Sequence, residues 1–323
     1  MAAILCDLKE GDEVIFLSYT FVSSANAFAL RGAKIIFADS YLDNTDIDPA
    51  AIEELITEKT KVIVPVHYAG FACDMEAIMN IARKHSLFVV EDAAQAIDSY
   101  YTFPNGTKKA LGSIGDLGAF SFHETKNIIA GEGGMLTINN PKFNERAEII
   151  REKGTNRSSF FRGEVNKYGW VDLGSSFLPS EIISAFLFGQ LEHLNTIQNK
   201  RKKIWDNYYA GLINLETEGR ISLPQIPKYA TNNGHMFFLV CKSLDERTKL
   251  ISHLKDKGIL AVFHYLSLNK SDYFLKNNAE ITIPNSDYFT DCLLRLPFYF
   301  ELSSFDQNYI IQSIQDFFQS QNN

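Results

Sequence analysis

Short apolar runs alternate with amphipathic segments through the first half of the chain. The runs lie at residues 13–16, 34–37, 62–64 and 87–90, and a helical pattern of apolar positions covers residues 74–84. Strands that alternate with helices are typical of a mostly parallel α/β sheet. Two more apolar runs, 118–120 and 135–138, predict further strands of this sheet.

The second half has a different pattern. Helical periodicity extends from residue 179 to about 212, which predicts one long helix. Strands are expected at 235–240 and 261–263, with helices near 246–257 and 304–319. The chain is therefore predicted to form a large domain, residues 1–210, and a smaller α+β C-terminal domain, residues 211–323.

Composition narrows the class of protein. The 323 residues are 46% hydrophobic, and 31 basic against 39 acidic residues give a net charge of −8. This excess of acid argues against binding to nucleic acid or to an anionic membrane. The four cysteines form no C-x-x-C pair, so neither a metal site nor a disulfide framework is indicated, and a cytoplasmic protein is expected. Neither a signal peptide nor an apolar run of membrane-spanning length is found.

Candidate chemistry lies between residues 87 and 134. Asp92 follows an apolar strand, and Lys126 precedes a glycine-rich stretch, 131–134. Pyridoxal phosphate needs a carboxylate beside its ring nitrogen and a lysine amine for its aldehyde. Acids at the carboxyl end of a parallel strand face the ligand crevice of such sheets. Together with the Ser121 hydroxyl as a phosphate ligand, the two residues predict a pyridoxal phosphate site.

Each candidate has a simpler structural alternative. Asp92 alone would most often be a helix N-cap, and Lys126 alone a solvated surface charge. His123 is interpreted first as a packed or hydrogen-bonded loop histidine, and Phe21 as a core residue. The combination of Asp92 and Lys126 favours the cofactor site. No G-x-G-x-x-G follows the first strand, so a nicotinamide site has little support.

Several motifs extend this interpretation to a family. They lie at residues 18–27, 64–70, 90–95, 122–127 and 151–158. With them the chain resembles the DegT/DnrJ/EryC1/StrS sugar aminotransferases, which are fold-type I pyridoxal phosphate enzymes. Residues 160–163, 167–168 and 170–176 resemble most closely the subgroup that makes dTDP-4-amino-4,6-dideoxygalactose.

The resemblance implies a role for each site residue. Lys126 is expected to form the Schiff base, and Asp92 to contact the pyridine nitrogen. Gln95 is expected to contact the ring hydroxyl or the sugar, and Ser121 the phosphate. Phe21 takes the position of the aromatic residue that stacks on the ring.

The implied reaction transfers an amino group from L-glutamate to C4 of dTDP-4-dehydro-6-deoxyglucose. Its product serves cell-envelope polysaccharides such as lipopolysaccharide and enterobacterial common antigen. The family works as a homodimer with its sites at the subunit interface. The substrate is expected to meet His123 and the basic residues Arg157, Arg162 and Lys167, although a solvated loop explains these charges equally well.

Some positions depart from the family pattern. Leu178 replaces a frequent asparagine, residues 263–269 lack an expected proline and histidine, and residues 101–109 predict an additional surface hairpin. Residues 1–8 resemble the end of a helix whose beginning, which cradles the cofactor phosphate in the family, is expected to be missing. Weak cofactor binding is therefore predicted, from either a truncated reading frame or a short protein that has lost activity.

Two rival functions are considered. A sugar dehydratase of the same family would carry histidine in place of Lys126, so the lysine argues against it. A noncatalytic scaffold would keep the fold without binding the cofactor.

Overall fold

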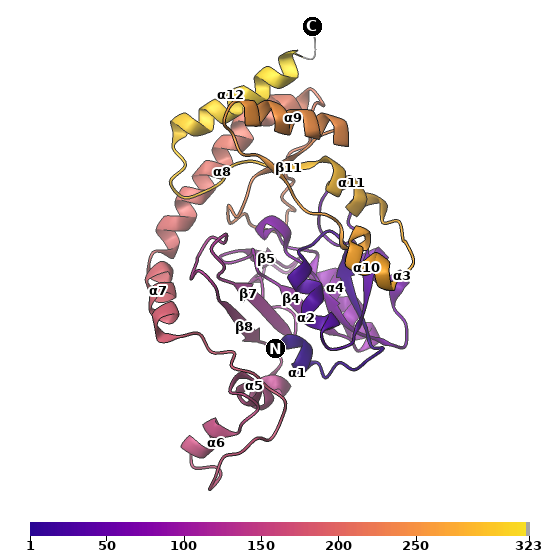
Figure 1. Ribbon diagram of the computed structural model, residues 1–323, viewed down its shortest axis with the longest axis vertical. Helices are drawn as coiled ribbons and strands as arrows, with labels where there is room; N and C mark the ends of the chain where they lie inside the picture. The colour runs from indigo at the N-terminus through magenta and orange to yellow at the C-terminus, as the bar shows by residue number, and fades with distance from the viewer. Residues whose placement is uncertain (321–323) are drawn as a thin grey trace.

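Six strands form the central sheet of the computed structural model, which describes residues 1–320 (Figure 1). Their order is β2-β1-β3-β4-β7-β8. The first five are parallel, and β8 is antiparallel to β7. The strands are β1 (Glu13–Leu17), β2 (Lys34–Ala38), β3 (Thr60–Val64), β4 (Phe88–Asp92), β7 (Leu117–Ser121) and β8 (Gly134–Ile138). The predicted mostly parallel sheet is confirmed.

Both faces of this sheet are buried. Alternate residues of β1 point to opposite sides, so that Ile15 joins one apolar cluster and Phe16 another. The first cluster includes residues of α3 (Pro49–Leu55) and α4 (Met75–His85), and the second those of α1 (Ala2–Leu5), α2 (Val22–Ala29) and α5 (Asn144–Arg151). Helices therefore cover the sheet on both sides, which explains why its strands read as continuous apolar runs.

The helix ends follow local sequence signals. Asp74 caps α4 by accepting a hydrogen bond from the Ala77 N–H at 3.1 Å. Asp48 caps α3 in the same way, with Pro49 in the first helical position. The predicted surface hairpin is also present, as β5 (Tyr100–Thr102) paired with β6 (Lys108–Ala110).

The C-terminal part is built on a small antiparallel sheet of order β10-β11-β9. Its strands are β9 (Phe238–Val240), β10 (Val262–Phe263) and β11 (Leu293–Arg295). The helices here are α9 (Leu244–Asp256), α10 (Asp272–Asn277), α11 (Pro284–Cys292) and α12 (Ser304–Ser320). The predicted strand at 235–240 begins only at Phe238.

The prediction of one helix from residue 179 to 212 was wrong. Two helices, α7 (Glu181–Glu192) and α8 (Leu194–Thr217), meet at His193, whose φ of −100° and ψ of 11° interrupt the helix. In Figure 1, α7 and α8 run along one side of the molecule and lead to the C-terminal helices.

The proposed domain division falls inside α8, because Gly211 belongs to this helix. One buried cluster contains both Ile15 of the central sheet and Leu239 of the small sheet. The division at residue 211 stays a prediction. In the described part of the chain, no helix combines the length and the apolar character needed to span a membrane.

Candidate active site

Asp92 ends β4 at the carboxyl edge of the central sheet. Its backbone N–H donates to Pro65 O at 2.8 Å, and its carbonyl accepts from the His67 N–H at 3.1 Å. The carboxylate accepts from the Ser24 hydroxyl at 2.5 Å and from the Ala94 N–H at 3.1 Å. Turns follow Asp92 and no helix does, so it is not the helix N-cap of the alternative interpretation. Its carboxylate instead faces the first turn of α2.

Glu91 lies behind Asp92 and is fully buried with His67. His67 Nε2 is 3.0 Å from the Glu91 carboxylate, which also accepts from the N–H groups of Gly112, Ile114 and Gly115 at 2.6–2.7 Å. A buried carboxylate needs this many donors to offset its lost hydration. The network holds the end of β4 in place, and thereby Asp92. The only sign of this network in the sequence is that Glu91 and Asp92 are adjacent acids.

Lys126 lies in the loop that joins β7 to β8. Backbone hydrogen bonds close this loop, among them Phe122 N–H to Gly133 O at 2.8 Å and Lys126 N–H to His123 O at 2.9 Å. Burial lowers the pKa of the Lys126 amine, the Asp92 carboxylate opposes this effect, and the Arg295 guanidinium adds to it. Asp92 is therefore close enough to Lys126 for their charges to interact. The structure brings the two central candidates into one site.

Gln95 connects the site to the C-terminal part. Its Oε1 accepts from the Ala69 N–H at 2.7 Å, and its Nε2 donates to the Tyr265 hydroxyl at 3.2 Å. The ring of Phe21 lies 5.9 Å from that of Tyr265, and 53% of Phe21 is exposed. Phe21 is therefore not a core residue within this chain, and its ring is open to a ligand.

Ser121 and His123 lie on the same loop as Lys126. Ser121 ends β7, and its hydroxyl accepts from the His123 N–H at 3.3 Å. His123 Nδ1 is 3.0 Å from the Thr125 hydroxyl, and its Nε2 is 3.8 Å from Glu132. His123 thus has the hydrogen bonds of an ordinary loop histidine, whereas the Ser121 hydroxyl stays available to a further donor.

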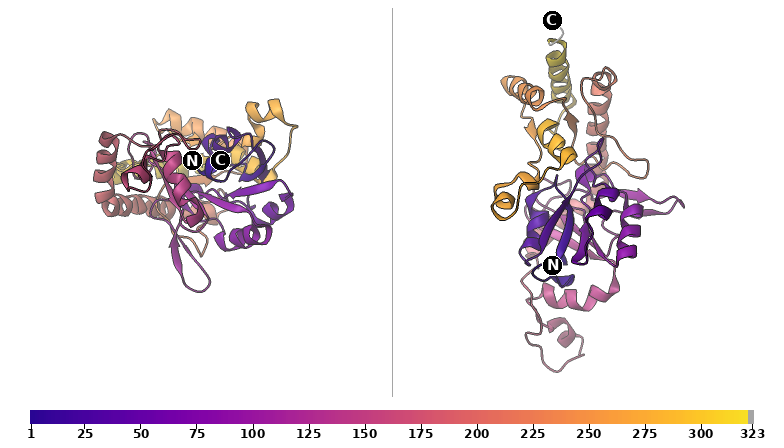
Figure 2. Two further views of the ribbon diagram at one scale, coloured as in Figure 1. Left: turned by 90° about the horizontal axis from the view of Figure 1, so that it is seen from below. Right: turned by 90° about the vertical axis from the view of Figure 1, so that its right-hand side faces the viewer.

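The basic candidates lie elsewhere. Because β8 is antiparallel to β7, the chain returns to the opposite edge of the sheet before α5 and α6 (Arg157–Phe161), and α6 projects beyond the body there (Figures 1 and 2). Arg162 pairs with Glu148 at 2.9 Å and Glu164 at 2.7 Å. Within one chain, Arg157, Arg162 and Lys167 are therefore not brought to Lys126.

An exposed apolar segment begins in α6 and continues into α7. We use this term for the following residues: Phe160, Phe161, Tyr168, Trp170, Val171, Leu173, Phe177, Leu178, Ile182, Phe186, Phe188 and Leu191. Helix α7 has no fully buried side chain, although it is strongly apolar. Its residues Ile183 and Leu187 pack beside Phe122 and Ile128 of the Lys126 loop. Exposed apolar surface on this scale marks an interaction site, and this one borders the candidate site.

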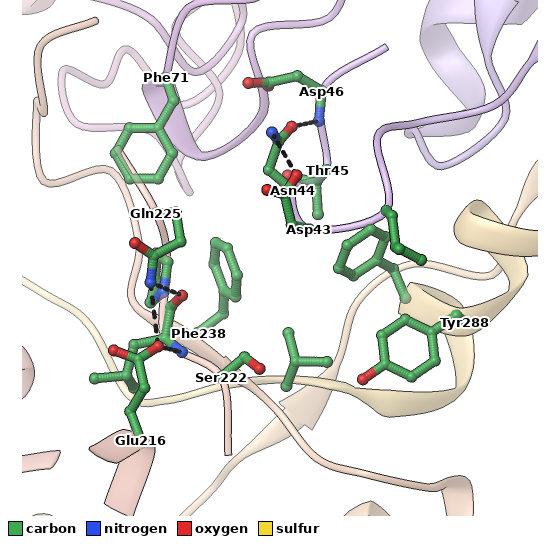
Figure 3. Close-up of a pocket in the computed structure, with 15 residues that line it drawn as sticks. Asp43, Asn44, Thr45, Asp46, Phe71, Glu216, Ser222, Gln225, Phe238 and Tyr288 are labelled. Carbon is green, nitrogen blue, oxygen red and sulfur yellow. Dashed lines mark hydrogen bonds between the residues drawn. The ribbon is translucent and has the colours of Figure 1, made fainter. Parts of the chain in front are cut away.

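A separate cavity of about 290 Å³ lies between the loop at residues 42–46 and the C-terminal part (Figure 3). Glu216 accepts there from the Leu223 N–H at 2.7 Å and from Gln225 Nε2 at 3.1 Å. None of the predicted site residues lines it. Within residues 1–320, no group of three or more His, Cys, Asp or Glu side chains is arranged to hold a metal ion.

Three residues of the C-terminal part lie at the site: His264, Tyr265 and Arg295. Sequence reasoning noted residues 263–269 only for their departure from the family pattern, and it missed Arg295. His264 Nδ1 lies 2.9 Å from the Tyr68 hydroxyl, and burial, assisted by the nearby Arg295, lowers the pKa of His264 to about 2. Burial also raises the pKa of Tyr265. These residues lie more than 130 positions after Lys126 in the chain, and the signal that could have pointed to Arg295 is an arginine within the apolar strand β11.

Comparison with known proteins agrees with this geometry. The model of the family described as "DegT/DnrJ/EryC1/StrS aminotransferase family" matches residues 1–315. The spore coat polysaccharide biosynthesis protein SpsC of Bacillus subtilis is 32% identical, over 95% of this chain and 79% of SpsC. An aminotransferase from Psychrobacter cryohalolentis has a similar structure, with a TM-score of 0.91, 26% identity and coverage of 100% of this chain and 85% of that one. The PLP form of the sugar aminotransferase Spr1654 from Streptococcus pneumoniae gives a TM-score of 0.88 at 25% identity, over 99% of this chain and 84% of that one.

Proposed function

The chain belongs to the DegT/DnrJ/EryC1/StrS aminotransferase family, with the fold-type I architecture of pyridoxal phosphate enzymes, and from this premise we propose its reaction. The protein transfers the amino group of L-glutamate to C4 of dTDP-4-dehydro-6-deoxyglucose and forms dTDP-4-amino-4,6-dideoxygalactose. It does so in the cytoplasm, for a cell-envelope polysaccharide. The resemblance of residues 160–176 to one subgroup supports this choice of sugar.

The residues present fit pyridoxal phosphate. The cofactor supplies an electron sink, which is effective when its ring nitrogen is protonated. The Asp92 carboxylate, held by the Ser24 hydroxyl and the Ala94 N–H, provides the negative charge that favours this protonation. The exposed ring of Phe21 offers a stacking surface, and the Ser121 hydroxyl a phosphate ligand.

Lys126 is the catalytic amine. Burial, which lowers the pKa of this amine, keeps a larger fraction of it neutral and nucleophilic. With the cofactor bound, the Lys126 amine would be the base that takes a proton from the α-carbon of the donor and the acid that returns one to the reacting carbon. Gln95, fixed between Ala69 and Tyr265, orients the cofactor hydroxyl or the sugar.

The enzyme works as a homodimer. The exposed apolar segment supports this state, because α7 packs one side on the Lys126 loop and leaves Ile182, which is 83% exposed, on the other. A second copy seated there would bring its own chain close to the first copy's Lys126. In this arrangement the sugar-nucleotide pyrophosphate bound to one subunit is reached by Arg157, Arg162 and Lys167 of the other subunit. His123 contacts the substrate bound to its own subunit.

One observation carries the proposal: Asp92 ends β4 beside β7, the strand that leads into the Lys126 loop, and its charge acts on the pKa of the partly buried Lys126 amine. The test adds pyridoxal phosphate to the purified chain. We expect a visible absorption band that L-glutamate bleaches and that dTDP-4-dehydro-6-deoxyglucose then restores. Lys126→Ala abolishes the band, whereas Lys109→Ala, in the exposed strand β6, leaves it unchanged.

The outcomes separate the parts of the proposal. Protein that stays colourless at saturating cofactor would contradict a transaminase and favour a noncatalytic scaffold. A band that glutamate bleaches but this sugar nucleotide does not restore would refute the sugar and leave the transaminase in place.

A further inference from the structure

Four buried polar side chains form a hydrogen-bonded group beside the Lys126 loop. We call them the polar cluster: Asn127, Gln198, Asn233 and His235, none of which is more than 7% exposed. Asn127 follows Lys126 directly, Gln198 belongs to α8, and the other two precede β9. Polar groups this deep in a protein need hydrogen-bond partners, and here they find them in one another.

Asn127 makes three hydrogen bonds in the polar cluster. Its Nδ2 donates to Gln198 Oε1 at 2.8 Å and to Asn233 O at 3.0 Å. Its Oδ1 lies 2.7 Å from His235 Nδ1. Because an amide oxygen can only accept, His235 Nδ1 carries a proton and is the donor of this bond. Each bond therefore has a single direction, and together they fix the side chain of Asn127.

Asn233 connects the polar cluster to the turn after β4. Its Nδ2 donates to Gln95 O at 2.8 Å and to Ile97 O at 2.9 Å. Its Oδ1 accepts from the His235 N–H at 3.0 Å. The polar cluster thus joins the turn that carries Gln95 to the loop that carries Lys126.

The Lys126 loop is attached to the later part of the chain through Asn127. Within residues 1–320, the hydrogen bonds that connect loop residues 122–133 to the chain after β8 all use the Asn127 side chain. The N–H of Lys126 donates inside the loop, to His123 O at 2.9 Å. Since the lysine side chain is long and flexible, the place of its amine depends on a fixed backbone. A displacement of about 1 Å at a reacting group can cost about 100-fold in rate.

We infer that Asn127 is a positioning residue, which holds the backbone of Lys126 where its amine reaches the cofactor aldehyde. The inference rests on the proposed transaminase function. Loss of Asn127 should then weaken the bond between the lysine and the aldehyde and spare the contacts of the cofactor ring and phosphate. A purely structural role of the polar cluster would instead affect all of these contacts alike.

The test compares two ligands. Pyridoxal phosphate carries the aldehyde, whereas 4-deoxypyridoxine phosphate has a methyl group in its place and cannot react with an amine. Their dissociation constants are measured by calorimetry for the unmodified chain, for Asn127→Ala and for Lys126→Ala, which sets the full loss from a missing lysine bond. Gln307→Ala is the matched control, because this buried amide of α12 donates to Ile204 O of α8 at 2.6 Å.

Asn127→Ala should weaken the binding of pyridoxal phosphate roughly 10-fold and leave the affinity for the aldehyde-free analogue nearly unchanged. In the Lys126→Ala background the same substitution should have no further effect on either ligand, because no lysine is left to position. Gln307→Ala should match the unmodified chain with both ligands.

His235 provides a second pair of variants, which serves if circular dichroism shows that Asn127→Ala does not fold. His235→Leu removes the N–H that Asn127 Oδ1 accepts, and it should produce a smaller form of the selective loss. His235→Asn places an amide N–H near the same point and should restore the affinity for pyridoxal phosphate.

Three results would overturn the inference: equal weakening of both ligands, unchanged binding of both, or a further loss in the Lys126→Ala background. Each would leave the polar cluster with a structural role only. If the unmodified chain binds pyridoxal phosphate no more tightly than the analogue, and Lys126→Ala changes nothing, the proposed function fails, which is distinct from a failure at Asn127 alone.

Discussion

The protonated form of the Lys126 amine is stabilised by Asp92 and destabilised by burial and by Arg295. Burial and the Arg295 cation lower the pKa of its amine, and Asp92 acts in the opposite direction. A lysine poised in this way is reactive because it is costly to keep protonated. The same cost should be measurable as stability.

We predict that Lys126→Met stabilises the cofactor-free protein by about 0.5–2 kcal/mol near neutral pH, as expected when a functional strain is relieved. Because the folded-state pKa of Lys126 lies below the unfolded value of 10.5, the native state binds fewer protons between these two values. The penalty in the unmodified chain is complete below the folded pKa and disappears as the pH rises toward 10.5. The gain from the substitution should therefore shrink over that interval.

Urea denaturation at neutral pH and near pH 10 measures this difference. Lys109→Met in the exposed strand β6 serves as the control. If the stability gain of Lys126→Met stays constant with pH, removal of the buried ammonium charge is not its cause.

Individual residues were predictable where a short motif carried their chemistry. Asp92 and Lys126 belong to such motifs, and the structure brings them together. Arg295 lies outside these motifs, and its significance depends on neighbours far along the chain. His67 lies within the motif at 64–70, but its pairing with Glu91 is visible only in the structure. Phe21 shows a further difficulty, because phenylalanine is usually buried and only the structure reveals its 53% exposure.

At the level of elements, β7 is built to pass very close to its neighbours. A Cβ added at Gly118 would lie 2.2 Å from Gly112 O and 2.5 Å from the Thr137 hydroxyl. The loop at Gly112 cannot easily move, because its N–H is bonded to the buried Glu91 at 2.7 Å. Gly118 therefore sets the spacing between β7, which leads into the Lys126 loop, and the support of Asp92.

We predict that Gly118→Ala lowers the free energy of unfolding by about 2–4 kcal/mol, because overpacking here displaces backbone. It should also weaken the cofactor band. Gly189→Ala in α7 is the matched control, since its added Cβ meets no atom of the chain within 4 Å. Chemical denaturation of both variants tests this, and equal stabilities would contradict the close packing at β7.

Strands were easier to predict than the ends of helices. Both faces of the parallel sheet are covered, so its strands stand out as apolar runs. The break between α7 and α8 at His193 has no proline or glycine to signal it. Its cause is tertiary, because α7 packs on the Lys126 loop while α8 extends into the C-terminal core.

For the whole molecule, the exposed apolar segment is the strongest departure from the surface of a monomer. Trp170 is 82% exposed and Ile182 is 83% exposed, on a stretch that also includes Phe186. Ile182 and Phe186 are four residues apart and so share one side of α7. Covering that side with a second copy would bury the apolar surface and enclose the Lys126 loop in the dimer.

The double variant Ile182→Asp/Phe186→Asp should therefore be monomeric, because two carboxylates would be desolvated in the interface. Light scattering should give twice the chain mass of 36.5 kDa for the unmodified protein and one chain mass for this variant. Leu30→Asp, at a position that is 84% exposed and outside the segment, should remain dimeric. If Arg157, Arg162 and Lys167 act on the neighbouring subunit, the monomeric variant should lose turnover of the sugar nucleotide while it retains its fold by circular dichroism. A monomeric unmodified chain, or a variant that stays dimeric, would refute the assignment of this surface.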